Sequence, residues 1–247
     1  MAQRHIHDLP QGNPKVSILV PTLLVGLMWA VFLLEWKGDY QWYFLGIYPR
    51  ETEGLLGIFT APFVHGDWNH LINNSIPMLI LGASVIYFYK EVAWKILLYS
   101  FLITGVWVWV GARPSWHIGA SGVVYALASF LFTSGLIRRN KHLLTVSLIV
   151  VFLYGSMIWG VLPIKHNVSW ESHLFGGIAG VVLAYFFRKE GPQRKIQVWE
   201  EEEEDDDLDD ENPYWLVDDQ HQNRVDHNAK PLNIRYIYKP NKREKDS

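Results

Sequence analysis

The feature that most constrains this chain is the run from Val16 to Leu34, nineteen residues without a charged side chain. A helix of that length spans about 30 Å of hydrocarbon, because each residue adds a rise of about 1.5 Å. Further apolar stretches follow, and we expect each to form a membrane helix. They cover residues 69–89, 92–111, 119–137, 143–162 and 171–187. The sequence therefore predicts an all-α membrane protein built as a bundle of six transmembrane helices.

The segments outside these helices have distinctive compositions. Residues 37–68 form a long first loop rich in aromatic side chains, which suit the headgroup level, so we expect this loop to lie in the membrane interface. Residues 191–247 include eight consecutive acidic residues at positions 200–207, and repulsion between like charges predicts a disordered acidic tail. The predicted organisation is a polar leader at 1–15, a membrane domain at 16–190 and this tail.

Basic residues predict the orientation of the bundle. The helix ends on the side of the N-terminus carry 11 Lys and Arg residues, whereas the opposite ends carry 4. By the positive-inside rule, both termini and the acidic tail lie in the cytoplasm. The first apolar run lacks a small-residue cleavage site, so we expect it to be retained. The expected location is a bacterial plasma membrane, in which the chain is an integral multi-pass protein.

Polar side chains gather at one end of three predicted helices. With the N-terminus inside, the second, fourth and sixth helices all begin on the outer side, so their first turns lie at similar depth. These turns carry His70 and Asn74, Ser121, and His173 respectively. Polar groups within membrane spans are costly and tend to mark function. We therefore infer that these side chains form one site.

Residue spacing indicates which helix faces meet at that site. His70 and Asn74 are four residues apart and share a face, as do Ser121 and Tyr125. The fourth and sixth helices also carry small residues, which let backbones approach closely. These small residues are Gly119, Gly122, Gly176 and Gly180. Such packing brings Ser121 within reach of His173.

The chemistry that these residue types support is nucleophilic catalysis. A serine hydroxyl is a poor nucleophile until a base accepts its proton, and a neutral imidazole is the usual base. Ser121 and His173 fit these two roles. The backbone N–H of Ser121, the Asn74 amide and His70 are candidate donors to the developing oxyanion. The chain has no cysteine, which excludes disulfides and thiol catalysis. We expect no metal, no cofactor and no nucleic-acid partner.

Ordinary explanations exist for each candidate. Ser121 can serve as a small packing residue, and Asn74 can bond to a neighbouring helix. His65 is a candidate for shaping the first loop, whereas His117, His142 and His166 are interpreted as interfacial. Glu171 lies two positions before His173 and is expected to point elsewhere, so it is not taken as a third catalytic residue. The shared depth of the main candidates favours the functional interpretation.

Three segments carry a resemblance to a known family. Residues 65–74 (HGDWNHLINN), 119–122 (GASG) and 172–180 (SHLFGGIAG) resemble, in order, the motifs of the rhomboid family of intramembrane serine proteases. The resemblance covers about residues 16–190. It implies a Ser121–His173 dyad without an aspartate, an oxyanion site that includes His70 and Asn74, and Tyr125 packed against His173.

The resemblance also implies a function and exposes one departure. Such enzymes cut transmembrane proteins near the outer membrane face, so transmembrane substrates and membrane lipid are the expected partners. Where the family often has a Trp-Arg pair in the first loop, this chain has Leu56 and Gly57, which puts the internal anchoring of that loop in doubt. The alternatives are a non-catalytic rhomboid-like protein that binds or shepherds membrane proteins, and a transporter or channel that uses the polar residues as a pathway. A transporter predicts ionisable groups deep within several helices.

Overall fold

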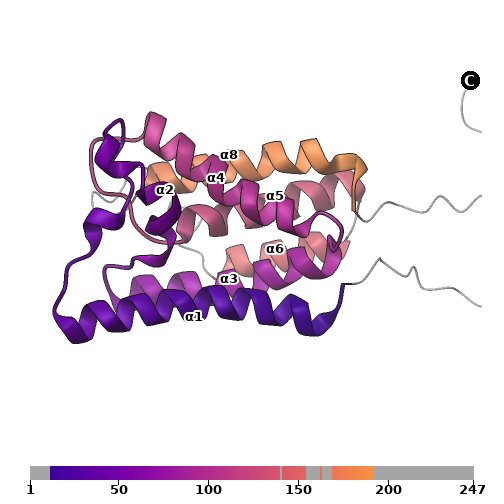
Figure 1. The fold of residues 1–247 in the computed structure, drawn as a ribbon. Coiled ribbons are helices and arrows are strands. Elements are labelled where there is room, and N and C mark those ends of the chain that lie inside the picture. The colour runs from indigo at the N-terminus through magenta and orange to yellow at the C-terminus, as the bar shows by residue number, and fades with distance from the viewer. Residues whose placement is uncertain (1–11, 140, 154–161, 163–168, 192–247) are drawn as a thin grey trace, which may run out of the picture. The chain divides into compact units, whose positions relative to one another are not determined.

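The protein is described here by a computed structural model that covers residues 12–139, 141–153, 162 and 169–191. Within these residues, the regular structure is helical apart from one isolated bridge, which confirms the all-α prediction (Figure 1). The long helices are α1 (Pro14–Gly38), α3 (Trp68–Phe88), α4 (Ala93–Gly111), α5 (Ser121–Arg138), α6 (Lys141–Leu153) and α8 (Trp170–Phe186).

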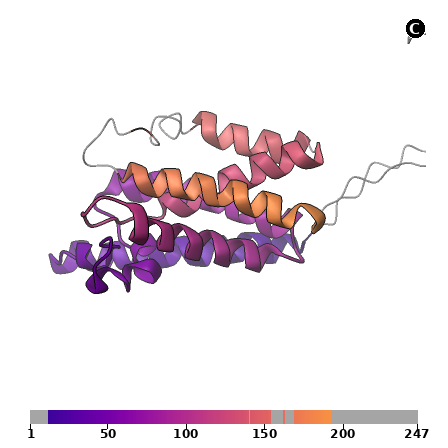
Figure 2. The ribbon, with the colours of Figure 1, turned by 90° about the horizontal axis from the view of Figure 1, so that it is seen from above.

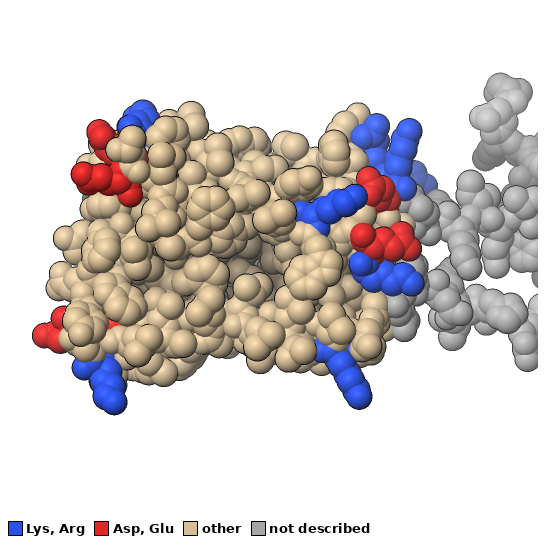
Figure 3. Space-filling view, in the orientation of Figure 1, with Lys and Arg blue, Asp and Glu red and all other residues tan. Residues whose placement is uncertain are grey.

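Within the described residues, five helices are long and apolar enough to cross a membrane, namely α1, α3, α4, α5 and α8 together with its terminal turn. Helix α6 is also apolar but has 13 residues as described, because the following residues 154–161 lie outside the described part. The count of six spans therefore stays a prediction. On the face drawn in Figure 3, charged side chains gather toward the two ends of the bundle and leave an uncharged belt between them.

The helix starts near the polar residues are set by local hydrogen bonds. Helix α3 begins after Asp67, whose carboxylate accepts the backbone N–H of His70 at 2.8 Å. This cap places His70 in the first turn and Asn74 one turn further along. Helix α5, by contrast, has no side-chain cap at Ala120. The first backbone N–H groups of a helix have no intrahelical partner, so those of α5 remain available to other acceptors.

Helix α5 is the centre of the bundle. It contacts α3, α4, α6 and α8. In its apolar stretch 67% of the residues are buried, whereas 28% are buried in the apolar stretch of α1. Figures 1 and 2 show α1 running along the outside of the bundle beside α3. The residues that begin α5 are therefore surrounded by other helices, whereas most of α1 remains exposed.

The first loop folds into short helical turns at the end of the bundle where α3, α5 and α8 begin (Figure 1). They are η1 (Tyr43–Leu45), η2 (Thr52–Gly54), α2 (Gly57–Thr60) and η3 (Ala61–Phe63). Ile47 forms an antiparallel bridge with His117, with N–H to O distances of 2.9 and 2.8 Å. The loop therefore lies against the segment that precedes α5. Its interfacial position in a bilayer stays a prediction.

The first loop has its own anchors despite the Leu56-Gly57 departure. A Cβ atom on Gly57 would lie 2.0 Å from the carbonyl oxygen of Gly46, so the two backbones touch. The Thr60 hydroxyl lies 2.5 Å from the carbonyl oxygen of Leu45 and 3.0 Å from that of Leu56. A backbone contact that requires glycine and a threonine hydroxyl thus hold this loop together.

The predicted terminal segments lie largely outside the described residues. Of the leader, residues 12–15 are described, and Pro14 and Lys15 already belong to α1. Of the predicted tail at 191–247, only Gly191 is described. The division into leader, membrane domain and tail therefore stays a prediction.

Candidate active site

Ser121 and His173 lie at the starts of two adjacent helices. Ser121 is the first residue of α5, and His173 is in the first turn of α8. The Ser121 Oγ and His173 Nε2 atoms are 2.8 Å apart, a distance at which the hydroxyl donates to a neutral imidazole. The His173 side chain is buried, with 8% of its surface exposed. The pair therefore has the geometry that a nucleophile and its base require.

The close approach of α5 and α8 accounts for this distance. A Cβ atom on Gly176 would lie 2.0 Å from the carbonyl oxygen of Gly122, and one on Gly180 would lie 2.1 Å from that of Ala126. On its other side, Gly122 faces the Thr104 side chain, which a Cβ atom would meet at 2.8 Å. No other residue type fits these contacts without moving the helices apart.

The imidazole of His173 is supported on one face by Tyr125. The two rings are stacked, with centroids 4.3 Å apart and planes inclined by 7°. Because Tyr125 is one turn along α5 from Ser121, a single helix presents both the hydroxyl and the ring that covers the imidazole. The stack favours one orientation of the His173 ring.

His70 and Asn74 approach the backbone just before Ser121. Gly119 has φ of +97°, a conformation that glycine adopts readily and other residues rarely do. A Cβ atom there would lie 2.4 Å from His70 Nε2 and 3.3 Å from Asn74 Nδ2. Helix α3 thus delivers both side chains to the segment that leads into Ser121.

The amide of Asn74 is a donor with no assigned acceptor. Its side chain is 4% exposed, and its Nδ2 atom has no hydrogen-bond partner within the described part of the chain. An unpaired buried donor costs free energy in the resting protein, and an oxyanion formed beside it would supply the missing acceptor. Together with the uncapped N–H of Ser121, it suits the stabilisation of an oxyanion.

His65 lies beside His70 and not beside Ser121. The two imidazole rings are 5.0 Å apart in an edge-to-face arrangement, and His65 Nδ1 lies 3.3 Å from the carbonyl oxygen of Phe63. Burial is the main cause that lowers the pKa of His65 to about 3, and the nearby His70 lowers it further. His65 is therefore neutral at physiological pH, and it supports the side of His70 that faces the first loop.

His117 is buried and hydrogen-bonded, which its interpretation as an interfacial residue did not predict, and its depth in a bilayer stays a prediction. This side chain is 2% exposed, its Nε2 lies 3.0 Å from the carbonyl oxygen of Arg113, and its Nδ1 is bonded to the hydroxyl of Ser169. Burial lowers its pKa. Sequence reasoning missed this role because the partner lies 52 residues away, at the start of α8. His142 is exposed on α6, and His166 lies outside the described residues.

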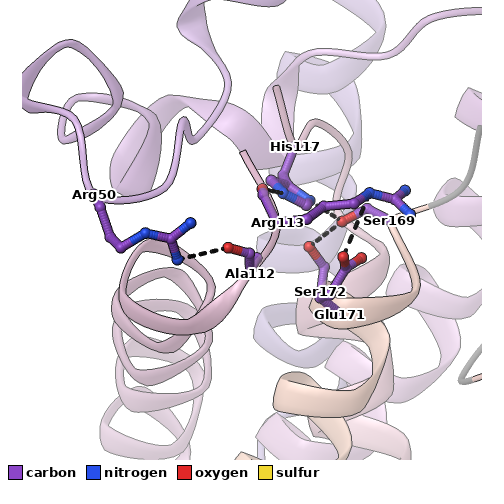
Figure 4. A network of polar contacts seen from close by, with 7 residues as sticks. All are labelled: Arg50, Ala112, Arg113, His117, Ser169, Glu171 and Ser172. Atoms are coloured by element: carbon purple, nitrogen blue, oxygen red, sulfur yellow. Dashed lines mark hydrogen bonds and ion pairs between the residues drawn. The ribbon is translucent and has the colours of Figure 1, made fainter. Parts of the chain in front are cut away.

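Glu171 points to a different partner from His173. Its carboxylate pairs with the Arg113 guanidinium at 3.4 Å, and its side chain is 5% exposed against 36% for Arg113 (Figure 4). This arrangement fits the expectation that Glu171 is directed elsewhere. The opposite charges of Arg113 and Glu171 are visible in the sequence. The two residues are far apart along the chain, however, so the sequence does not show that they form an ion pair.

The apolar helices of the described part define this chain as a helical membrane protein, and the Ser121–His173 pair gives it a partly buried polar site at one end of its bundle. The model of the rhomboid domain matches residues 52–190, which include all these polar residues. The chain belongs to the rhomboid family. With five helices suited to crossing a bilayer, it is an integral membrane protein.

Similar proteins occur in bacteria and in an animal. An uncharacterized protein of Mycobacterium tuberculosis (strain H37Rv) is 34% identical over 181 residues, which cover 69% of this chain and 74% of the relative. An uncharacterized protein of Mycobacterium leprae is 34% identical over 172 residues, or 63% and 64% of the two chains. Rhomboid-related protein 2 of Mus musculus is 23% identical over 193 residues, or 70% and 64%. The mycobacterial relatives fit a bacterial origin.

Proposed function

We propose that this protein is an intramembrane serine endopeptidase that hydrolyses peptide bonds in or near the transmembrane segments of membrane proteins. The observation that carries the proposal is the 2.8 Å separation of Ser121 Oγ and His173 Nε2 in a partly buried site. Membership of the rhomboid family supports the same activity. The proposed substrates are transmembrane proteins that reach the site from the surrounding lipid.

The first half of the proposed reaction acylates the serine. His173 Nε2 accepts the hydroxyl proton while Ser121 Oγ attacks the carbonyl carbon of the scissile peptide. The carbonyl oxygen becomes an oxyanion, which accepts hydrogen bonds from the Ser121 N–H, Asn74 Nδ2 and His70. The imidazolium of His173 then donates its proton to the leaving amine as the C–N bond breaks. The products of this half are an acyl-enzyme and a free amino terminus.

The second half of the proposed reaction releases the enzyme. His173 accepts a proton from a water molecule, whose oxygen attacks the acyl carbon of the Ser121 ester. The same donors stabilise the second oxyanion, and the proton on His173 returns to Ser121 Oγ as the ester bond breaks. The Tyr125 ring keeps the imidazole oriented through both halves.

The test combines a chemical probe with a cleavage reporter. In detergent, Ser121 is expected to react with a serine-directed fluorophosphonate, and the wild type is expected to cleave a transmembrane reporter in membranes. Ser121→Ala removes both signals, and His173→Ala reduces both to background. The matched control is Ser84→Ala on α3, where the lost hydroxyl lies 2.7 Å from the carbonyl oxygen of Ile80 in its own helix. Wild-type cleavage by Ser121→Ala would overturn the enzymatic proposal and leave the non-catalytic alternative.

We also propose the topology and the division of the chain. Both termini lie in the cytoplasm, residues 16–190 form a six-helix membrane domain, and residues 191–247 form a solvated acidic tail. Removal of residues 196–247 is expected to leave reporter cleavage within about twofold of the wild type, because the site residues lie on α3, α5 and α8. A tenfold loss on truncation would give the tail a role in the reaction.

A further inference from the structure

Five residues outside the proposed catalytic set form a polar cluster between the loop before α5 and the first turn of α8 (Figure 4). We call it the loop–helix cluster, and its members are Arg113, His117, Ser169, Glu171 and Ser172. The proposed reaction uses none of them. His117 and Glu171 are buried, and buried polar groups are costly unless they are paired, so their arrangement calls for a physical reason.

The hydrogen bonds of the cluster run in one direction. The carbonyl of Arg113 can only accept, so His117 Nε2 donates to it, at 3.0 Å, and Nδ1 is left as an acceptor. The Ser169 hydroxyl therefore donates to His117 Nδ1. Its oxygen in turn accepts from the Ser172 hydroxyl at 2.6 Å. A chain of donors thus leads from α8 to the loop.

An ion pair runs parallel to this chain. Arg113 Nε lies 3.4 Å from Glu171 Oε1, and the Glu171 side chain is almost fully buried. A buried carboxylate without a cation strongly destabilises a fold. The ion pair therefore holds the first turn of α8 against this loop. Two independent polar links therefore connect the same two segments.

The loop is held on its other side by the first loop. Arg50 Nη1 donates to the carbonyl oxygen of Ala112 at 2.8 Å (Figure 4). In addition, Ile47 pairs with the backbone of His117. Residues 112–118 are thus fixed between the first loop and α8. Movement of the α8 turn relative to this frame would break several hydrogen bonds at once.

The cluster lies next to the proposed base in sequence. Ser172 directly precedes His173, Glu171 lies in the same turn of α8, and Ser169 is the residue just before that helix begins. Two glycine contacts set how closely α5 and α8 approach, between Gly176 and Gly122 and between Gly180 and Ala126, and both lie after His173 along α8. The loop–helix cluster attaches the residues that come before His173. His173 therefore lies between two attachments of α8, which together fix its first turn.

We infer that Ser169 and the Arg113–Glu171 pair are positioning residues, which hold the first turn of α8 so that His173 Nε2 faces Ser121 Oγ. This inference rests on the proposed function, because positioning matters only if a proton passes between these atoms. Displacement of a reacting group by about 1 Å can cost up to about 10²-fold in rate. Loss of the cluster therefore lowers kcat and leaves substrate binding intact.

The first experiment removes one hydroxyl in the full-length protein in detergent. Ser169→Ala is expected to lower kcat for a transmembrane reporter about tenfold and to slow fluorophosphonate labelling of Ser121 similarly, with KM within about twofold of the wild type. Ser169→Thr retains a hydroxyl and is expected to restore at least half of the lost rate. Ser84→Ala is the matched control, because it removes a hydroxyl bonded only within α3. Its kcat is expected to equal that of the wild type.

The second experiment tests the ion pair by reversal of its charges. Arg113→Glu and Glu171→Arg are each expected to lower kcat more than tenfold, because each places two like charges together. The double variant restores opposite charges and is expected to recover at least tenfold over either single variant. Glu53→Gln, an exposed carboxylate in the first loop, is the control. Recovery in the double variant identifies the pair itself as the cause.

The outcomes separate this inference from the proposed function. If the wild type neither labels nor cleaves, the proposed function fails, and the positioning role fails with it. If the wild type is active but Ser169→Ala retains its kcat, the positioning role alone is overturned. A fall in the melting temperature with unchanged kcat, or a loss of kcat that neither Ser169→Thr nor the charge reversal restores, also overturns it. A lower kcat at constant KM with recovery in both rescue variants supports it.

Discussion

Tyr125 lies flat against His173, with the ring centroids 4.3 Å apart and the ring planes only 7° from parallel. The tyrosine belongs to α5, which also carries Ser121, whereas the histidine belongs to α8. The helix that presents the Ser121 hydroxyl therefore also orients the imidazole, through Tyr125. Two contacts from α5 therefore meet the imidazole, the Tyr125 stack and the Ser121 hydrogen bond.

The stack predicts a graded response to substitution of Tyr125. An aromatic stack is worth about 0.5–1.5 kcal/mol, so Tyr125→Ala is expected to lower kcat by up to about tenfold. Tyr125→Phe keeps the ring and is expected to retain most of the activity. Reporter cleavage at saturating substrate is the measurement. Equal losses for the two variants would show that the hydroxyl, not the stack, supports His173.

Adjacent glycines on α8 provide a matched pair for the helix contact. Gly176→Ala places a methyl group 2.0 Å from the carbonyl oxygen of Gly122, whereas a Cβ atom on Gly177 meets nothing within 4 Å. We expect Gly176→Ala to destabilise the protein by about 1–3 kcal/mol and to lower fluorophosphonate labelling about 10²-fold. Gly177→Ala is expected to leave labelling unchanged and the melting temperature equal or higher, since glycine disfavours helices. Similar behaviour of the two variants would contradict the backbone contact.

Asn74 is expected to act on the transition state and not on the fold. Asn74→Ala removes a buried Nδ2 donor that has no partner among the described residues, so little native hydrogen bonding is lost. Loss of one oxyanion donor typically costs about 10²–10³ in kcat, and we expect a loss of that size with a near-normal melting temperature. Asn73→Ala is the control, because Asn73 is exposed one position earlier on α3. Unchanged kcat in Asn74→Ala would remove Asn74 from the oxyanion site but leave Ser121 and His173 in place.

The buried His65 predicts how stability depends on pH. Its pKa is lowered from 6.5 to about 3 in the folded protein, mainly by burial, so the unfolded chain binds a proton between these values that the folded chain does not. Stability is therefore expected to fall as pH decreases from about 6.5 toward 3, by up to about 1.4 kcal/mol per pH unit. The lowered pKa of His117 acts in the same direction.

Thermal unfolding in detergent between pH 7 and pH 4 measures this dependence. The His65→Gln variant is expected to show a flatter dependence of melting temperature on pH than the wild type. His142→Gln is the control, because His142 is exposed on α6. A wild-type slope in His65→Gln would assign the acid sensitivity to other groups.

Much of the fold follows from hydropathy alone. Apolar runs about long enough to span hydrocarbon predict α1, α3, α4, α5 and α8 to within a few residues, because a membrane span tolerates few alternatives to a helix. Reasoning about depth then gathers polar side chains at one level, and the structure places Ser121 beside His173. Small residues at four-residue spacing indicate which faces meet.

The contacts that depend on backbone conformation could not be predicted from the sequence. The left-handed conformation of Gly119 brings His70 and Asn74 to the start of α5, but a Gly-Ala-Ser-Gly run fits an ordinary helix start equally well. The burial of His117 was missed for a related reason. A short polar loop has no periodicity from which burial can be inferred, and its partner Ser169 lies far along the chain. Such pairings arise only when the tertiary structure brings the loops together.

The glycine contact between α5 and α8 has a consequence for genetics. Because no side chain separates Gly122 from Gly176, any added carbon there acts on the folded protein and on the Ser121–His173 distance together. A selection for inactive mutants is therefore expected to return these glycines alongside the serine and the histidine. A parallel measurement of how much of each mutant accumulates in the membrane will not fully separate the glycine mutants from the serine and histidine mutants. Only alleles that leave the backbone contact untouched report on the chemistry by itself.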